Sequence, residues 1–130
     1  MLCYGDTIAN VNLKELFNFH NSHPGSVTIT SYQLQSQFGI LSSNKSGIVT
    51  SFAEKPKLDT WINIGYFIIN QNVLNIIDRY QTFIDFLNEL INKKELYVYK
   101  HHGLHITVNT FTELKIAEKN INQYNKLINN

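Results

Sequence analysis

The sequence contains a single cysteine, Cys3, and that scarcity excludes two kinds of protein at once. One thiol cannot form an internal disulfide framework, and it cannot build a zinc site that depends on several cysteines. No apolar run approaches the ~20 residues of a membrane-spanning helix, and the N-terminus lacks the charged region and long apolar stretch of a signal peptide. We therefore expect a cytoplasmic protein with no membrane partner.

An excess of charge of one sign is also missing. Eleven basic residues stand against ten acidic ones, the formal net charge is +1, and the chain contains no basic tract. A protein that binds nucleic acid electrostatically concentrates lysine and arginine on one face. We therefore expect no nucleic-acid partner, and at about 100–200 residues per domain we expect a single domain over residues 1–130.

Hydrophobic periodicity and turn residues predict strands that alternate with helices. The predicted strands are residues 2–4, 26–32, 38–41, 48–52, 61–69, 96–100 and 104–108, with 38–41 and 48–52 forming a hairpin. The predicted helices are one capped by Asn12 and ended by Pro24–Gly25, then 71–78, 82–93, and one opened by Thr110 and Glu113 whose apolar side extends to Ile128. This order predicts an α/β layered domain with a largely parallel sheet and one antiparallel hairpin. The nearly apolar strand 61–69 is expected to be buried on both faces, and Cys3 to be packed.

Two charged positions follow predicted strands. Asp6 comes directly after a strand end and a glycine, where a carboxylate is suited to bind a metal ion, although a plain turn aspartate explains the pattern about equally well. Glu54 and Lys55 precede a proline at another strand end, where lysine can bind a phosphate and glutamate can accept sugar hydroxyls. A solvated loop pair is the alternative for these two residues.

Polar residues also interrupt or follow apolar strands. Asn63 and Gly65 lie inside the strand 61–69, which indicates either close approach by a ligand or chain, or a bulge with tight packing. His101 and His105 are the two histidines of their cluster that can converge, because neighbouring residues on a strand point to opposite faces. No cysteine or carboxylate joins them nearby, so a metal site there is the weaker interpretation.

Read in order, several segments resemble the sugar-1-phosphate nucleotidyltransferases, in particular the glucose-1-phosphate cytidylyltransferase branch. The segments are YGDTIANVNLKELFNFHNSH, FGILSSNKSGIVTSFAEKP, WINIGYFIIN and ELYVYKHHG. The resemblance implies a Rossmann-like mixed sheet with flanking helices, and a Mg²⁺-dependent reaction in which a sugar-1-phosphate attacks the α-phosphate of a nucleoside triphosphate. It also implies that Asp6 is a metal ligand, that Lys55 contacts the sugar phosphate, and that Glu54, Asn63 and Gly65 lie near the sugar.

The sequence departs from the family pattern in two places. The family has a glycine-rich loop that holds the nucleotide phosphates, whereas every glycine here is isolated, so we expect the N-terminal nucleotide-binding part of the domain to be missing. The family's second metal aspartate lies in a pattern like GFWxxMDT, and GLHITVNT here puts Asn109 at that position. An asparagine offers an oxygen without negative charge, which weakens a magnesium site.

These departures predict a truncated relative that is inactive by itself. One alternative is a split enzyme, in which a complementary N-terminal chain supplies the nucleotide half. Another is a non-catalytic binding or assembly module, because an exposed sheet edge near residues 2–4 favours pairing with another chain or a second copy. A sugar phosphate remains the expected ligand under the first two hypotheses.

Overall fold

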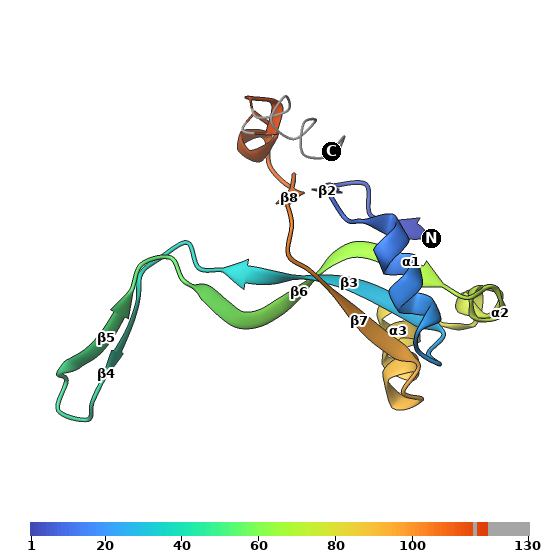
Figure 1. Cartoon of the computed structure of the whole chain (residues 1–130), viewed down its shortest axis with the longest axis horizontal. Helices are drawn as coiled ribbons and strands as arrows, with labels where there is room; N and C mark the ends of the chain where they lie inside the picture. The colour runs from blue at the N-terminus through green and yellow to red at the C-terminus, as the bar shows by residue number, and fades with distance from the viewer. Residues whose placement is uncertain (116, 120–130) are drawn as a thin grey trace.

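A four-stranded mixed sheet forms the centre of the computed structural model, which describes residues 1–115 and 117–119 (Figure 1). Its strands lie in the order β1 (Leu2–Cys3), β6 (Lys57–Ile69), β3 (Val27–Gln35) and β7 (Leu96–His101). β3 and β7 pair in parallel, whereas β6 is antiparallel to both of its neighbours, β1 and β3. The α/β class and the position of residues 2–3 at a sheet edge are confirmed, but the expectation of a largely parallel sheet is wrong.

The direction of β6 follows from the segment that precedes it. β3 leads into β4 (Ile40–Ser43), which pairs with β5 (Val49–Ala53) before the chain returns as β6. Antiparallel strands can be joined by a hairpin, whereas parallel neighbours need a crossover that is usually a helix. Because residues 36–56 contain no helix, β3 and β6 pair antiparallel, and the hairpin projects away from the rest of the molecule (Figure 1). We call residues 38–53 the hairpin arm.

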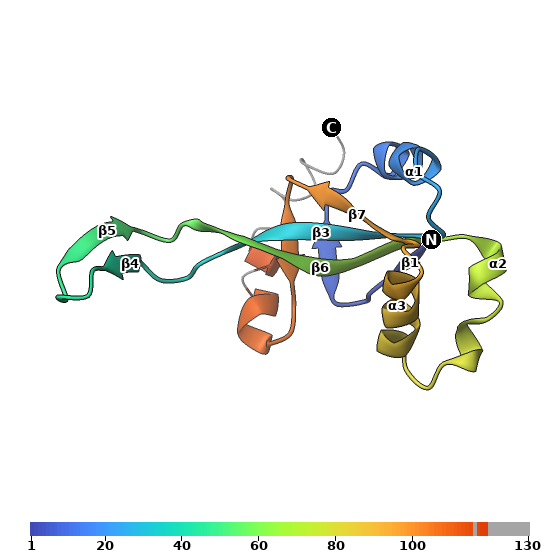
Figure 2. The same ribbon diagram turned by 90° about the horizontal axis from the view of Figure 1, so that it is seen from below.

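Helices cover both faces of the sheet. α1 (Leu13–Asn21) lies on one face, and α3 (Phe83–Asn92) lies on the other together with the short α2 (Gln71–Leu74), as Figure 2 shows. Five buried apolar residues make the core between the sheet and α3: Val27, Phe67, Val73, Phe86 and Leu90. Both longer helices begin at side-chain caps, in which Asn12 Oδ1 accepts from the N–H of Glu15 at 3.2 Å and Thr82 forms a capping box with Asp85.

Several predicted elements differ from the observed ones. The predicted helix 71–78 is α2 followed by a separate 3₁₀ turn at Ile77–Arg79. β3 and β6 are longer than predicted, and β6 is not buried on both faces throughout, because its first half pairs with β3 alone and leaves Asp59, Thr60 and Asn63 exposed. Cys3 is exposed rather than packed, since alternation along the edge strand turns Leu2 inward and Cys3 outward.

A second, two-stranded sheet stands beside the first. It pairs β2 (Thr7–Ala9), which was not predicted, antiparallel with β8 (His105–Thr107). After β8, the capping box of Thr110 and Glu113 opens a helix as predicted, with the Glu113 N–H donating to Thr110 Oγ1 at 3.2 Å. The described residues 111–115 and 117–119 are helical, and the rest of the predicted apolar side, Ile121 to Ile128, lies outside the described residues. Within that described part, no helix has the length and apolarity needed to span a membrane.

Candidate functional site

The β2–β8 pair brings together the two positions expected to hold a metal ion. Thr7 faces Thr107 across this ladder, and the N–H of Val108 donates to the carbonyl oxygen of Asp6 at 2.9 Å. Since the strands are antiparallel, Asp6 precedes one strand and Asn109 follows the other at the same end of the ladder. Both side chains are exposed, so both are open to an approaching ligand.

A second set of contacts fixes the backbone before Asp6. The N–H of Tyr4 donates to the carbonyl oxygen of Gly65 at 2.9 Å, and a Cβ placed on Gly65 would lie 2.5 Å from Tyr4 Cγ. Gly65 has a φ of +77°, and its N–H donates to Asn63 Oδ1 at 2.8 Å, while Asn63 Nδ2 lies 3.4 Å from Tyr4 Oη. The register of β6 against β3 shifts at this point. The close approach at Gly65 comes from the chain's own Tyr4, which the sequence pattern did not single out. This contact and the register shift agree with the alternative of a bulge with tight packing at Asn63 and Gly65.

Glu54 and Lys55 lie elsewhere, at the base of the hairpin arm. Both are exposed, Lys55 has a positive φ of 45°, and its carbonyl oxygen accepts from Gln35 Nε2 at 3.0 Å. From Lys57 to Asn63, β6 runs as extended strand, and six residues of strand span about 20 Å. The structure thus brings Asn63 and Gly65 to the segment of Asp6 through Tyr4, but it does not bring Glu54 and Lys55 to the same place.

His101 and His105 converge on the ring of Tyr32 rather than on a metal site. Their ring centroids lie 6.3 and 5.0 Å from that of Tyr32. His101 Nε2 donates to the carbonyl oxygen of Leu104 at 3.0 Å, and burial, followed by the neighbouring His101, lowers the pKa of His105. Across the described residues, no three His, Cys, Asp or Glu side chains gather as metal ligands.

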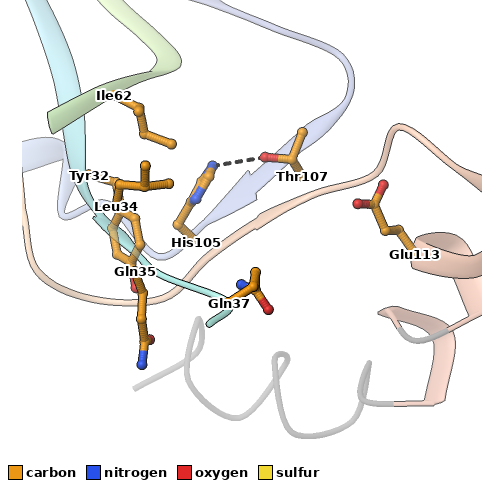
Figure 3. Close-up of a pocket in the computed structure, with 8 residues that line it drawn as sticks. All are labelled: Tyr32, Leu34, Gln35, Gln37, Ile62, His105, Thr107 and Glu113. Atoms are coloured by element: carbon orange, nitrogen blue, oxygen red, sulfur yellow. Dashed lines mark hydrogen bonds between the residues drawn. The ribbon is translucent and has the colours of Figure 1, made fainter. Parts of the chain in front are cut away.

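A cavity of about 440 Å³ opens between β3, β8 and the helix that follows β8 (Figure 3). Its lining includes Tyr32, Gln35, His105, Thr107 and Glu113. The Glu113 carboxylate is held by the N–H groups of Asn109 and Thr110 at 2.8 and 3.0 Å, and these bonds, with Asn109 the larger, lower its pKa. Sequence reasoning missed Tyr32 and Gln35 as cavity residues because no local motif marks them.

The sequence pattern of the nucleotidyl transferase family matches residues 1–103. The chain belongs to this family. It is 34% identical over 126 residues to the "Probable glucose-1-phosphate cytidylyltransferase" of Bacillus subtilis (strain 168), covering 95% of this chain and 49% of that protein. It is 35% identical over 106 residues to the glucose-1-phosphate cytidylyltransferase of Salmonella typhimurium, covering 79% of this chain and 41% of that protein.

The fold is also similar to that of a solved structure. The structure of HddC from Yersinia pseudotuberculosis matches with a TM-score of 0.55 and 19% identity, covering 90% of this chain and 52% of that one. The partial Rossmann-like mixed sheet with flanking helices is therefore confirmed. The chain spans about half the length of the relatives that it matches.

The oxygen donors of Asp6 and Asn109 decide whether these two residues fit Mg²⁺. Asp6 supplies one carboxylate, and Asn109 supplies one neutral amide oxygen, at the same end of the β2–β8 ladder. Mg²⁺ is commonly held by one or two carboxylates together with substrate phosphates. The pair therefore fits Mg²⁺ only in the company of phosphate oxygens, with one negative charge fewer than two carboxylates provide.

Proposed function

We propose that this chain is the sugar-phosphate side of a sugar-1-phosphate nucleotidyltransferase and that the 130-residue chain is inactive by itself. The observation that carries the proposal is the placement of Asp6 and Asn109 at one end of the β2–β8 ladder, with a carboxylate at only one of the two positions. The relatives from Bacillus subtilis and Salmonella typhimurium are named for transfer to glucose-1-phosphate, which supports a sugar phosphate as the ligand.

The proposed roles follow the chemistry of the side chains. Asp6 would hold Mg²⁺ together with phosphate oxygens. At the separate place where β5 leads into β6, Lys55 would bind the sugar phosphate as a point charge and Glu54 would accept sugar hydroxyls. Asn63 and Gly65 would lie near the sugar and position Tyr4, because Gly65 makes room for the Tyr4 ring and Asn63 contacts the Tyr4 hydroxyl. Phosphoryl-type transfer consists mainly of positioning and charge neutralisation, and removing one oriented electrostatic contact costs roughly 10²–10³ in rate.

The absence of catalysis follows from the phosphate contacts that the sequence lacks. All six glycines of the chain are isolated, so no glycine-rich loop presents a run of backbone N–H groups to a triphosphate. Asn109 also removes one anionic oxygen from the metal site. Together these features leave the reacting phosphate without its main sources of binding and charge neutralisation.

A pyrophosphate-release assay tests this proposal. The purified chain is incubated with CTP, Mg²⁺ and glucose-1-phosphate, alongside Lys55→Ala and Asp6→Asn as matched controls. We expect the wild-type rate to equal that of both variants, while isothermal titration with glucose-1-phosphate alone detects binding that Lys55→Ala weakens. Turnover that both substitutions abolish would show that the chain is active alone and would contradict the proposal.

A second candidate function is an assembly module, favoured by the hairpin arm. Phe38, Leu41, Ile48 and Phe52 of the arm are 79%, 58%, 64% and 65% exposed. A two-stranded hairpin by itself is marginally stable in water, so burial of these side chains against another chain would stabilise it. The partner is a second copy in a homo-oligomer or, in a split enzyme, a chain that carries the nucleotide half. Activity restored by mixing with such a chain would support the split enzyme.

A further inference from the structure

Two histidines and a threonine form a hydrogen-bonded cluster between α1 and the sheet, in which His20 and Thr28 are buried and His23 is partly buried. His20, in the last turn of α1, is 5% exposed, and Thr28 on β3 is fully buried. His20 Nδ1 lies 2.8 Å from Thr28 Oγ1, and His20 Nε2 lies 2.9 Å from Asn70 Oδ1. His23 Nε2 lies 2.8 Å from the same threonine oxygen, and the N–H of Gly25 donates to His23 Nδ1 at 3.1 Å.

One arrangement of protons satisfies all four of these bonds. The Gly25 N–H can only donate, so His23 Nδ1 is the acceptor, and the proton of the neutral ring is on Nε2, which donates to Thr28. The single hydroxyl proton of Thr28 then goes to His20 Nδ1. His20 therefore carries its own proton on Nε2, where it donates to Asn70 Oδ1. Both imidazoles are neutral in this arrangement, and both are Nε2–H tautomers.

The hydrogen-bond partners of the two imidazoles are all neutral. His23 stacks on Tyr97 of β7 with ring centroids 3.9 Å apart and meets the His20 ring edge-on at 5.4 Å. The nearby titratable groups are Tyr97 and Tyr99 on β7 and Glu15 on α1, whose carboxylate accepts from the Tyr99 hydroxyl at 3.2 Å. β3 contributes the neutral Thr28, and α2, which Asn70 precedes, has no charged residue. In the part of the chain that is described, no carboxylate bonds either histidine ring.

We propose that His20, His23 and Thr28 form an acid-labile clasp that holds α1 on the sheet. A proton added to His23 puts an N–H on Nδ1 opposite the N–H of Gly25, so two donors face each other. A proton added to His20 Nδ1 forces the Thr28 hydroxyl proton away from its acceptor, inside a fully buried site. The first event breaks a bond inside the turn that joins α1 to β3, and the second breaks the bond between His20 on α1 and Thr28 on the sheet. Asp6 directly precedes β2, and β2 leads into α1. Release of α1 therefore also loosens the segment that contains Asp6.

The pH range follows from the direction of the shift. Burial, and next the neighbouring His20, lowers the pKa of His23 below its ordinary value. The unfolded chain, with a histidine pKa of about 6.5, then binds a proton more readily than the folded chain does. The free energy of unfolding is therefore unaffected above that pH and falls as the pH drops below it. The clasp is therefore closed at neutral pH and opens under mild acid.

Imidazole ¹⁵N NMR on the full chain tests the proposal directly. We expect His20 and His23 to show Nε2–H tautomers at pH 7.5, and His23 to remain neutral at the ordinary histidine pKa of about 6.5. Thr28→Ser should preserve this pattern, whereas Thr28→Val should change the His20 shifts. An Nδ1–H tautomer for either ring, or a His23 ring that is mostly protonated at about pH 6.5, would overturn the proposal.

Hydrogen exchange supplies a second readout that does not depend on assigning the rings. Between pH 7 and 5, after correction for intrinsic rates, α1 amides should lose protection more than α3 amides. His23→Gln retains a donor at the Nε2 position and cannot titrate, so it should reduce this loss, and His102→Gln serves as the matched control. Equal loss in α1 and α3, or in His23→Gln and wild type, would contradict an acid-labile clasp. The outcome is independent of the nucleotidyltransferase proposal, since neither measurement requires activity.

Discussion

At the scale of single residues, the two positions proposed to hold Mg²⁺ differ in charge, since Asp6 has a carboxylate and Asn109 has a neutral amide. Asn109, where a second metal-binding carboxylate is expected, follows β8 at the end of the ladder where Asp6 precedes β2. Nothing in the backbone there excludes an aspartate, because Asn109 is exposed and its N–H is already bonded to Glu113. The substitution therefore removes a negative charge while leaving the ladder intact.

The substitution Asn109→Asp should restore part of the cation affinity. Two opposite charges 4 Å apart gain about 1 kcal/mol in water, and a divalent ion about twice that before salt screening, so we expect roughly tenfold tighter Mn²⁺ binding. Electron paramagnetic resonance of Mn²⁺ in the presence of CTP measures the change. The exposed Asn18→Asp on α1 adds the same charge away from the site. Equal effects of the two substitutions would indicate general charge attraction and count against a site at Asp6 and Asn109.

At the scale of elements, the bulge in β6 determines how the edge strand meets the sheet. Gly65 holds a positive φ, and its missing side chain makes room for the ring of Tyr4, which leads through Gly5 to Asp6. Gly47 in the hairpin turn also has a positive φ, of 82°, but a Cβ there would meet nothing within 4 Å. Both positions therefore favour glycine because of their positive φ, and only Gly65 must also lack a side chain to avoid a clash with Tyr4.

This difference predicts unequal costs for the same substitution. Gly47→Ala should cost about 1 kcal/mol of unfolding free energy, the usual penalty for a left-handed alanine. Gly65→Ala should cost about 2–4 kcal/mol, because the added methyl group also collides with Tyr4. Urea denaturation of both variants measures the costs, and Tyr4→Ala should recover part of the loss in a Gly65→Ala background. Equal costs for the two alanines would mean that Tyr4 does not constrain Gly65.

At the scale of the whole molecule, the sequence predicts elements that depend on residues close together in the chain. It does not predict the pairings between segments that are far apart in the chain. Asn12 caps its helix, and Thr110 with Glu113 opens the last one, because a cap depends on residues three positions apart. The β2–β8 ladder and the bond between His20 and Asn70 join segments far apart in the chain, so no local pattern marks them. The family resemblance identified the candidate residues, but it could not show that Lys55, at the base of the hairpin arm, lies away from Asp6.

The exposed apolar side chains of the hairpin arm predict self-association. Leu41 and Phe52 face each other across the hairpin and are 58% and 65% exposed. Among the elements that the structure describes, no other packs extensively against β4 or β5. Light scattering should therefore give a mass above the 15.1 kDa of one chain, and Phe52→Lys should lower that mass by placing a charge in the contact. Ile84→Lys on α3 replaces a side chain of similar exposure, 62%, and should leave the mass unchanged. A wild-type chain that stays monomeric at high concentration, or an Ile84→Lys variant that dissociates as fully as Phe52→Lys, would show that the arm is not the contact.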